Sequence, residues 1–262
     1  MIDLHCHMLP GIDDGAPDLA TALRMARVAV ADGITCTACT PHIYPGLYEN
    51  NKQGIVAAVA ALRQALAEAD IRLELTTGAD THLAPDLLES LRKGLIPTIN
   101  DSRYLLLEPP HHVAPPRFEE SVFQLVGAGY VPVITHPERL TWIETHYPIF
   151  ERLVKAVCWM QLTAGSVTGG FGKRPLYWSE RMLDEGLVHI LATDAHRAER
   201  RPPLLAAGRD AVAKRLGDEE ATCQVLTRPR GILMDHAPSE LPPLPVARRP
   251  YKPFWQSLLR RA

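Results

Sequence analysis

The sequence predicts an α/β fold in which a parallel sheet is closed, or nearly closed, into a barrel. Seven apolar, β-branched runs alternate with segments of helical spacing, which is typical of parallel sheets. Histidines and carboxylates recur at the ends of these runs, where such barrels carry their reactive residues. An open doubly wound sheet is the alternative, but it would place a site at one switch point and not draw residues from nearly every strand. The seven expected strands span residues 2–7, 34–40, 72–79, 103–108, 131–136, 158–164 and 188–194.

The expected helices lie between these strands. The first has apolar residues at Leu19, Leu23, Ala26 and Val30, and Gly33 ends it. A single domain over residues 1–236 follows from this alternation, because 262 residues suit one α/β barrel. The remaining helices are expected at 51–69, 84–93, 117–128, 147–156 and 175–186, with a short helical segment at 218–227.

Residues 237–262 differ in composition from the domain. They are rich in proline, and from Pro242 onward they carry five Arg or Lys residues and no acid. This composition is typical of an extended, solvated tail. A docking segment that uses Tyr251, Phe254 and Trp255 is the alternative, and membrane contact is expected only through this tail.

Charge and cysteine content limit the possible partners and the compartment. A net charge of -2 gives no electrostatic reason to expect nucleic acid as a partner. The five cysteines have no framework spacing, which indicates reduced thiols. No basic and apolar signal region precedes Asp3, and no apolar run is long enough to span a bilayer. We therefore expect a cytoplasmic protein, whose oligomeric state the sequence leaves open.

The first fourteen residues predict part of a metal site. His5 and His7 lie two apart on one strand, so they face the same way and can bind one ion. Two ordinary buried histidines would explain this pair alone. However, six further candidates follow at the ends of later runs, and Asp14 follows the first run, with Asp13 as its alternative. The expected ligands are His5, His7, Asp14, His42, Asp80, Glu108, His136, Asp194 and His196, with His82 as a possible substitute for Asp80.

These ligand types indicate a hydrolytic centre. Histidine and carboxylate without thiolate suit several Mn, Fe or Zn ions and disfavour a structural zinc site. A hydroxide held between two ions is a ready nucleophile, and the ions neutralise charge on a phosphoryl group. A phosphate substrate also needs cationic donors. Arg139, three residues after His136, and Arg201, five after His196, are the candidates for this role.

A phosphatase that uses a cysteine nucleophile is excluded by spacing, because that chemistry needs Cys, five residues and then Arg. The residues six positions after the five cysteines are Ile12, His42, Pro45, Ala164 and Pro229.

Together these motifs resemble the bacterial manganese-dependent tyrosine-protein phosphatases of the PHP fold, which act in capsule and exopolysaccharide control. The resemblance runs from Met1 to about Asp235. It rests on the motifs HCHMLPGIDDG, TPH, NDSRYLLLE, THPER, LTAGS with the following GGFG, and TDAH with RRPP.

The resemblance implies a distorted seven-stranded, TIM-like (β/α)7 barrel with three divalent ions, expected to be Mn, with Fe or Zn as alternatives. It assigns His5, His7, Asp80 and Asp194 to one ion. Asp80, Glu108 and His136 would hold a second, and Asp14, His42 and His196 a third. Arg139 and Arg201 match the phosphate-binding arginines, and the implied substrate is phosphotyrosine on a tyrosine kinase of polysaccharide export. One position departs from the pattern, because the family usually has Glu where this chain has Asp80.

Three other functions compete with this interpretation. A related enzyme could act on a small phosphomonoester such as histidinol phosphate. A nuclease with the same metals should have a basic groove, and no basic cluster lies near the motifs. A scaffold with a vestigial metal site is disfavoured because every metal position holds a competent ligand.

Overall fold

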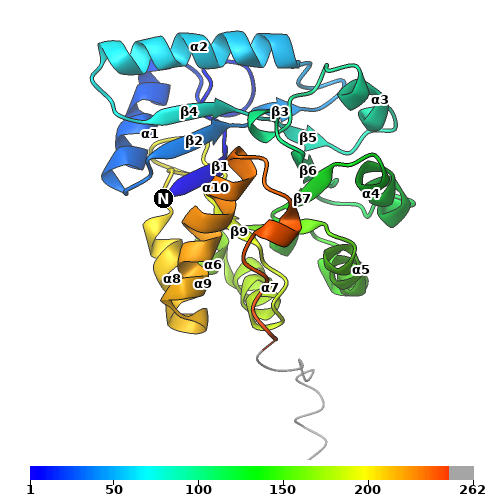
Figure 1. The fold of residues 1–262 in the computed structure, drawn as a ribbon. Helices are drawn as coiled ribbons and strands as arrows, with labels where there is room; N and C mark the ends of the chain where they lie inside the picture. Colours follow the sequence, from blue (N-terminus) through cyan, green and yellow to red (C-terminus); the bar gives the residue numbers. More distant parts are fainter. Residues whose placement is uncertain (248–262) are drawn as a thin grey trace, which may run out of the picture.

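The computed structural model describes residues 1–247, in which parallel strands form two sheets with helices around them (Figure 1). A three-stranded sheet has the order β1-β2-β4, and a six-stranded sheet has the order β3-β5-β6-β7-β8-β9. All strand pairs are parallel. The strands are β1 (Ile2–Cys6), β2 (Cys36–Cys39), β3 (His42–Ile43), β4 (Glu74–Thr77), β5 (Asp80–His82), β6 (Tyr104–Glu108), β7 (Val131–Thr135), β8 (Trp159–Thr163) and β9 (Ile190–Ala192).

The strand count differs from the seven expected because two strands are interrupted. The run expected at 34–40 becomes β2, and β3 follows it after Pro41, which has no N–H to donate to a ladder. The run expected at 72–79 becomes β4, and β5 follows after Gly78. The ladder between β2 and β4 therefore ends before the one between β3 and β5 begins. The described residues form two parallel sheets and not one continuous closed sheet.

Backbone hydrogen bonds also join the first strand to the segment after the last one. The Asp194 N–H donates to the His5 carbonyl, and the His7 N–H donates to the Ala195 carbonyl, both at 2.8 Å. The buried Asp3 carboxylate strengthens this junction, since it accepts from the Thr193 N–H at 2.9 Å and from the Thr193 hydroxyl at 2.5 Å. These contacts hold β1 beside the end of β9, and they place His5 of β1 and His7, just after it, next to Asp194.

The helices largely follow the predicted order. The first two begin at side-chain caps, in which Asp18 accepts from Thr21 N at 2.7 Å and Asn51 from Gly54 N at 3.0 Å. The helices are α1 (Leu19–Ala31), α2 (Lys52–Glu68), α3 (Leu87–Arg92), α4 (Phe118–Gly127), α5 (Ile143–Lys155), α6 (Ala164–Val167), α7 (Lys173–Asp184), α8 (Ala206–Leu216), α9 (Asp218–Thr222) and α10 (Arg228–Leu233).

Several helical segments differ from expectation, and α6 and α10 form where the sequence predicted no helix. Helix α5 begins four residues earlier than expected and contains Pro148 in its interior. Helix α8 was not predicted, because its buried residues Gly208, Val212 and Leu216 make a sparse apolar stripe. Residues 218–227 divide into α9 and a π-helical turn, η3 (Cys223–Thr227).

The segment after α10 packs on the domain. Arg228 is fully buried, and its guanidinium is paired with Glu220 at 2.7 and 2.9 Å. The same guanidinium donates to the carbonyls of Pro242 and Pro243 at 3.0 and 2.8 Å. Leu241 is 8% exposed and lies against Gly231, where an added Cβ would be 2.2 Å from its Cδ2. The first part of the expected tail therefore contacts the domain, while Tyr251, Phe254 and Trp255 lie outside the described residues.

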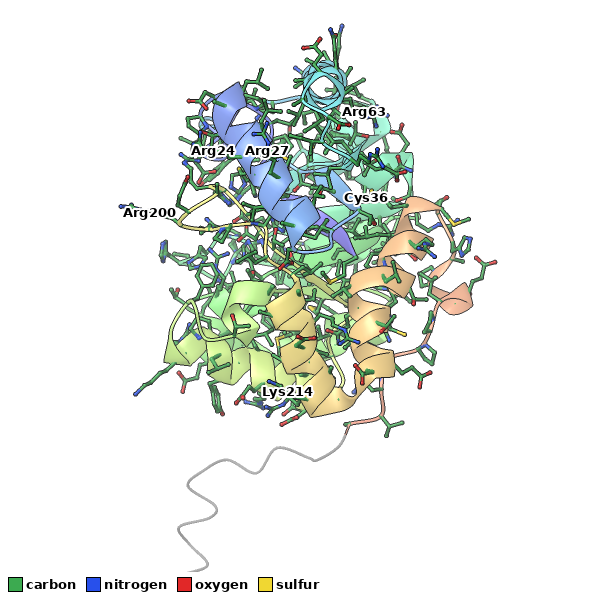
Figure 2. All side chains as sticks on the ribbon, turned by 90° about the vertical axis from the view of Figure 1, so that its left-hand side faces the viewer. Arg24, Arg27, Cys36, Arg63, Arg200 and Lys214 are labelled. Atoms are coloured by element: carbon green, nitrogen blue, oxygen red, sulfur yellow. The ribbon has the colours of Figure 1, made fainter. Side chains whose placement is uncertain are left out.

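The loop after β9 lies beside α1. Figure 2 shows Arg24 and Arg27 on α1 and Arg200 on the loop after β9, and Arg24 Nε lies 3.5 Å from Glu199 Oε1. Within residues 1–247, no helix has both the length and the apolar character that crossing a bilayer would require.

Candidate metal centre

The structure brings all nine expected ligands together at the carboxyl ends of the strands. They come from both sheets and from the loops that follow β1, β7 and β9. Most are buried, whereas the Asp14 side chain is 49% exposed and lies at the open side of the cluster. Three overlapping groups have their ligand atoms within 4.8 Å of one another, and they consist of His5, His7 and Asp80; of His42, Asp80 and Glu108; and of His7, Asp14, His42 and His196.

The first group is formed by the two histidines of the opening motif. His5 Nε2 lies 3.1 Å from His7 Nε2 and 3.3 Å from Asp80 Oδ2. Asp194 Oδ1 is 3.5 Å from His5 Nε2 and 3.4 Å from His7 Nε2. The Nε2 atoms of His5 and His7 thus lie close to both carboxylates, as an ion bound by all four side chains would require.

The second group lies across Asp80. His42 Nδ1 is 3.4 Å from both Asp80 Oδ2 and Glu108 Oε2. His136 Nε2 lies 3.6 Å from Glu108 Oε1. His82, the alternative to Asp80, lies 3.7 Å from Glu108 Oε2 through its Nδ1. Asp80 therefore contacts both the first and the second group, which is the position of a bridging carboxylate.

The third group is built on Asp14. Its Oδ1 lies 3.3 Å from His196 Nε2 and 3.5 Å from His42 Nε2. Asp13, the alternative ligand, has a different partner, because its Oδ2 accepts a hydrogen bond from His7 Nδ1 at 2.8 Å. Asp14 thus faces the histidine cluster, whereas Asp13 contacts His7 through Nδ1, the ring nitrogen that points away from the cluster.

Gln161, which the sequence did not reveal as a site residue, and Asp13, the alternative to Asp14, set the histidine tautomers. His5 Nδ1 lies 2.8 Å from Gln161 Oε1, and the Gln161 amide nitrogen donates to the Leu162 carbonyl at 2.8 Å, which fixes the amide orientation. Gln161 therefore accepts from His5 Nδ1, as Asp13 does from His7 Nδ1, and each histidine keeps its Nε2 lone pair for an ion. The only sequence signal for Gln161 is the alternation of side chains along the expected strand 158–164, which directs every second residue into the interior.

The turn that carries Arg139 is anchored by a buried carboxylate. His136 has left-handed backbone angles, with φ 34 and ψ 51, and the 3-10 turn η2 (Pro137–Arg139) follows it. Glu138 is fully buried, and its Oε1 accepts from Thr163 N at 3.0 Å. This contact fixes the turn to the end of β8 and so determines where Arg139 lies.

The chemistry of the donor set fits divalent cations. Both Asp80 carboxylate oxygens are buried and lack a hydrogen-bond partner among the described residues, and so does Nδ1 of His42. A buried carboxylate without hydrogen bonds is costly unless a cation compensates its charge. A metal ion between Asp80 and the neighbouring imidazoles would supply that compensation.

The electrostatics of the cluster also favour positive charge. Burial opposes protonation of His5, but Asp80 and Asp194 outweigh it and raise its pKa to about 9. At His42 burial is likewise outweighed, by Glu108 and Asp80, and its pKa rises to about 10. His136 differs, because burial and Arg139 lower its pKa to about 3. The carboxylates thus create a field in which metal ions compete with protons for these imidazoles.

The two expected phosphate-binding arginines meet beside this cluster. Arg139 Nη1 and Arg201 Nη2 both donate to Asp194 Oδ2. Their side chains are 17% and 28% exposed, so both can be reached from solvent. A guanidinium pair next to metal ligands can bind the oxygens of a phosphoryl group.

Known proteins are similar to this chain in sequence and in fold. Tyrosine-protein phosphatase YwqE of Bacillus subtilis (strain 168) is 34% identical over 254 residues, which cover 95% of this chain and 98% of YwqE. A chain from the crystal structures of YwqE and of CpsB from Streptococcus pneumoniae, which are described as unique metal-dependent tyrosine phosphatases, superposes with a TM-score of 0.89. It is 31% identical, and the match covers 96% of this chain and 100% of that chain.

A more distant structure shares the fold alone. Histidinol phosphate phosphatase from Lactococcus lactis, solved with zinc, L-histidinol and phosphate, has a TM-score of 0.53 and 13% identity, and the match covers 84% of this chain and 93% of that one.

Residues 1–234 match the family described as capsular polysaccharide synthesis, CpsB/CapC. The chain therefore belongs to the CpsB/CapC family.

Proposed function

We propose that this chain is a metal-dependent protein-tyrosine phosphatase of capsule or exopolysaccharide synthesis. It is a phosphoric monoester hydrolase, like the family members to which it is similar. The observation that carries the proposal is the buried histidine and carboxylate cluster with Arg139 and Arg201 on the shared ligand Asp194. The substrate we infer is phosphotyrosine on a bacterial tyrosine kinase of polysaccharide export.

We further propose three divalent ions, with Mn as the expected metal. Asp80 is the proposed bridge, and its two buried oxygens, which have no hydrogen-bond partner among the described residues, support that role. The assignments we propose are His5, His7, Asp80 and Asp194 for one ion, Asp80, Glu108 and His136 for the second, and Asp14, His42 and His196 for the third. The clusters in the structure overlap with these sets, since His42 also lies with Asp80 and Glu108, and His7 also lies with Asp14, His42 and His196.

The protein contributes orientation and charge to the reaction. Divalent ions, when bound by these residues, would activate a water and neutralise phosphoryl charge. Gln161 and Asp13 hold His5 and His7 in the tautomers that leave Nε2 free. Arg139 and Arg201 take phosphoryl oxygens and align the phosphorus with the cluster, which lowers the entropic part of the barrier.

The cysteines are unsuited to nucleophilic catalysis. All five are free and buried. Burial raises the pKa of Cys36 to about 11 and the pKa of Cys39 and Cys158 to about 12, so these thiols stay protonated at neutral pH. Free thiols also support the proposed cytoplasmic location, since they persist in reducing compartments.

We propose that the two sheets belong to one distorted seven-stranded barrel. On this view β2 and β3 are one strand, and so are β4 and β5. Hydrogen bonds across both interruptions support this, because Gly78 N donates to the Cys39 carbonyl and Asp80 N to the Pro41 carbonyl, each at 3.1 Å. The junction between His5 and Asp194 would then close the barrel.

The alternative is a small-molecule phosphomonoesterase of the histidinol phosphatase kind. The likeness to that enzyme is at 13% identity and concerns the fold, whereas the likeness to tyrosine phosphatases is at 31 and 34%. The main proposal is therefore better supported.

One experiment separates these functions. Turnover of a phosphotyrosine peptide and of histidinol phosphate is measured side by side, with Mn²⁺ and after chelation. We expect Mn-dependent hydrolysis of the peptide that survives cysteine alkylation. Preferred turnover of histidinol phosphate would favour the alternative, and loss of activity with a thiol reagent but not with a chelator would refute both.

A further inference from the structure

Two like charges lie close together beside the cluster, and something must hold them there. Arg139 and Arg201 share one acceptor, Asp194 Oδ2. In the proposed reaction the phosphoryl group also needs both guanidinium groups. A second contact that holds each arginine independently of Asp194 would keep the pair in place as its hydrogen-bond partners change.

The ring of Phe171 makes this second contact with both side chains. The Arg139 guanidinium carbon lies 4.7 Å from the centre of the Phe171 ring, and that of Arg201 lies 5.8 Å from the same centre. Both distances are within the range of cation–π attraction, in which the negative face of an aromatic ring attracts a cation. One apolar side chain thus contacts both cationic groups.

The loop that carries Phe171 leaves room for the ring through its glycines. An added Cβ at Gly165 would lie 2.7 Å from Phe171 Cε2, so only glycine lets the ring pack there. Gly170 N donates to the Gly165 carbonyl at 2.7 Å, which closes the loop, and Gly172 has φ +93. The sequence motif GGFG therefore places an aromatic ring next to the arginines.

We propose that Phe171 is a positioning residue, whose ring holds Arg139 and Arg201 at the spacing that binds two oxygens of one phosphoryl group. It has no polar atom and acts only through the arginines. This proposal rests on the phosphatase function proposed above. It assigns a role to the segment after LTAGS, which metal binding by the expected ligands does not require.

The test compares ring-preserving and ring-removing variants of the full chain loaded with Mn²⁺. Phe171→Leu keeps an apolar side chain but removes the aromatic face, whereas Phe171→Tyr keeps the face. Phe171 and Arg201 line a cavity of about 230 Å³, so the Phe171 side chain borders open space. Phe123→Leu on α4, where the side chain is 42% exposed, is the matched control.

The readouts are the inhibition constant of orthophosphate, KM and kcat for a small aryl phosphate, and bound metal. We expect Phe171→Leu to weaken orthophosphate binding and raise KM about tenfold, with a smaller change in kcat and unchanged metal content. Phe171→Tyr and Phe123→Leu should stay within about twofold of the parent chain.

A variant pair shows whether Phe171 acts through an arginine. In an Arg139→Ala background, Phe171→Leu should have a clearly smaller effect on orthophosphate binding, because one of its two partners is gone. An undiminished effect there, loss of metal in Phe171→Leu, or parent-like phosphate binding in Phe171→Leu would each overturn the proposal. If the parent chain itself hydrolysed no aryl phosphate, the proposed function would fail first.

Discussion

Asp194 connects the two histidines of the opening motif, the two arginines and the backbone of β1. Its Oδ1 faces His5 and His7, and its Oδ2 accepts from both arginines. Its backbone adopts a left-handed φ of 50, and its N–H donates to the His5 carbonyl. The position of this carboxylate is therefore fixed from both its backbone and its side chain, and each substitution around it tests a different part of the proposed chemistry.

Replacing either arginine should separate phosphate binding from metal binding. We expect Arg139→Ala or Arg201→Ala to lower kcat/KM for an aryl phosphate about ten- to a hundredfold, because each removes a hydrogen bond from a charged donor. Metal content by elemental analysis should stay unchanged. Arg200→Ala, an exposed neighbour, is the control. Wild-type turnover in both variants would show that the arginines do not contact the substrate.

Asp80 tests the bridge between the first two groups. Its side chain is shorter than that of Glu by one methylene, about 1.5 Å of reach, yet its Oδ2 lies 3.3 Å from His5 Nε2 and 3.4 Å from His42 Nδ1. We expect Asp80→Asn to lower metal content and to reduce turnover by about two orders of magnitude. Thr81→Ala, at the adjacent buried position, should change neither quantity comparably. Full metal loading of Asp80→Asn would rule out the bridging role.

At the scale of elements, the sequence predicted strand ends better than strand continuity. Apolar runs located the expected ligands because each run ends at the same edge of a parallel arrangement. The interruptions at Pro41 and Gly78 were not predicted, since they depend on hydrogen bonds with neighbouring strands. Gln161 was missed because nothing in the local sequence WMQLT distinguishes it from a residue that only packs in the interior. Helix α8 was missed because only Gly208, Val212 and Leu216 form its buried face, which is a sparse apolar pattern.

His189 links β9 to β8 and predicts a pH dependence of stability. Its Nδ1 accepts from Met160 N at 3.1 Å, and its ring stacks on Trp159 at 4.7 Å. Burial, with Arg228 nearby, lowers its pKa well below 6.5. The unfolded chain takes up this proton below about pH 6.5 and the folded chain does not, so stability is present above that pH and lost as pH falls.

The measurement is urea unfolding at pH 7.5 and 5.5. For His189→Gln we expect the loss of unfolding free energy between these two pH values to be smaller than in the parent chain by about 1 kcal/mol. The variant itself should be less stable at pH 7.5, because the ring contact with Trp159 is gone. An unchanged pH dependence would mean that another group controls it.

At the scale of the whole molecule, the segment after α10 belongs to the folded domain. Arg228 connects the Glu220 carboxylate to the carbonyls of Pro242 and Pro243, and it also donates to the His189 carbonyl at 3.1 Å. The segment is rich in proline, and its residues 242–247 contain no helix or strand. Its contacts depend on a buried arginine far back in the chain, which composition does not reveal.

Two truncations test this packing. A chain that ends at residue 247 should keep both stability and turnover of a small aryl phosphate. A chain that ends at residue 240 loses Leu241 and two carbonyl partners of Arg228, so we expect its free energy of unfolding to fall by about 2 to 4 kcal/mol. Urea unfolding of both chains gives the comparison. Equal stability of the two would show that these contacts contribute nothing.

The junction of β1 with the end of β9 has a consequence for biosynthesis. Thr193 and Asp3 are 190 positions apart, so this closure carries a large entropic cost and must follow synthesis of most of the chain. While Asp194 and Arg201 have not yet emerged from the ribosome, the nascent chain lacks a metal-site carboxylate and one of the two phosphate-binding arginines. Catalysis should therefore begin only after the ends of the fold have met. In refolding experiments, recovery of turnover should lag behind recovery of the helical signal, so that activity reports completion of the molecule.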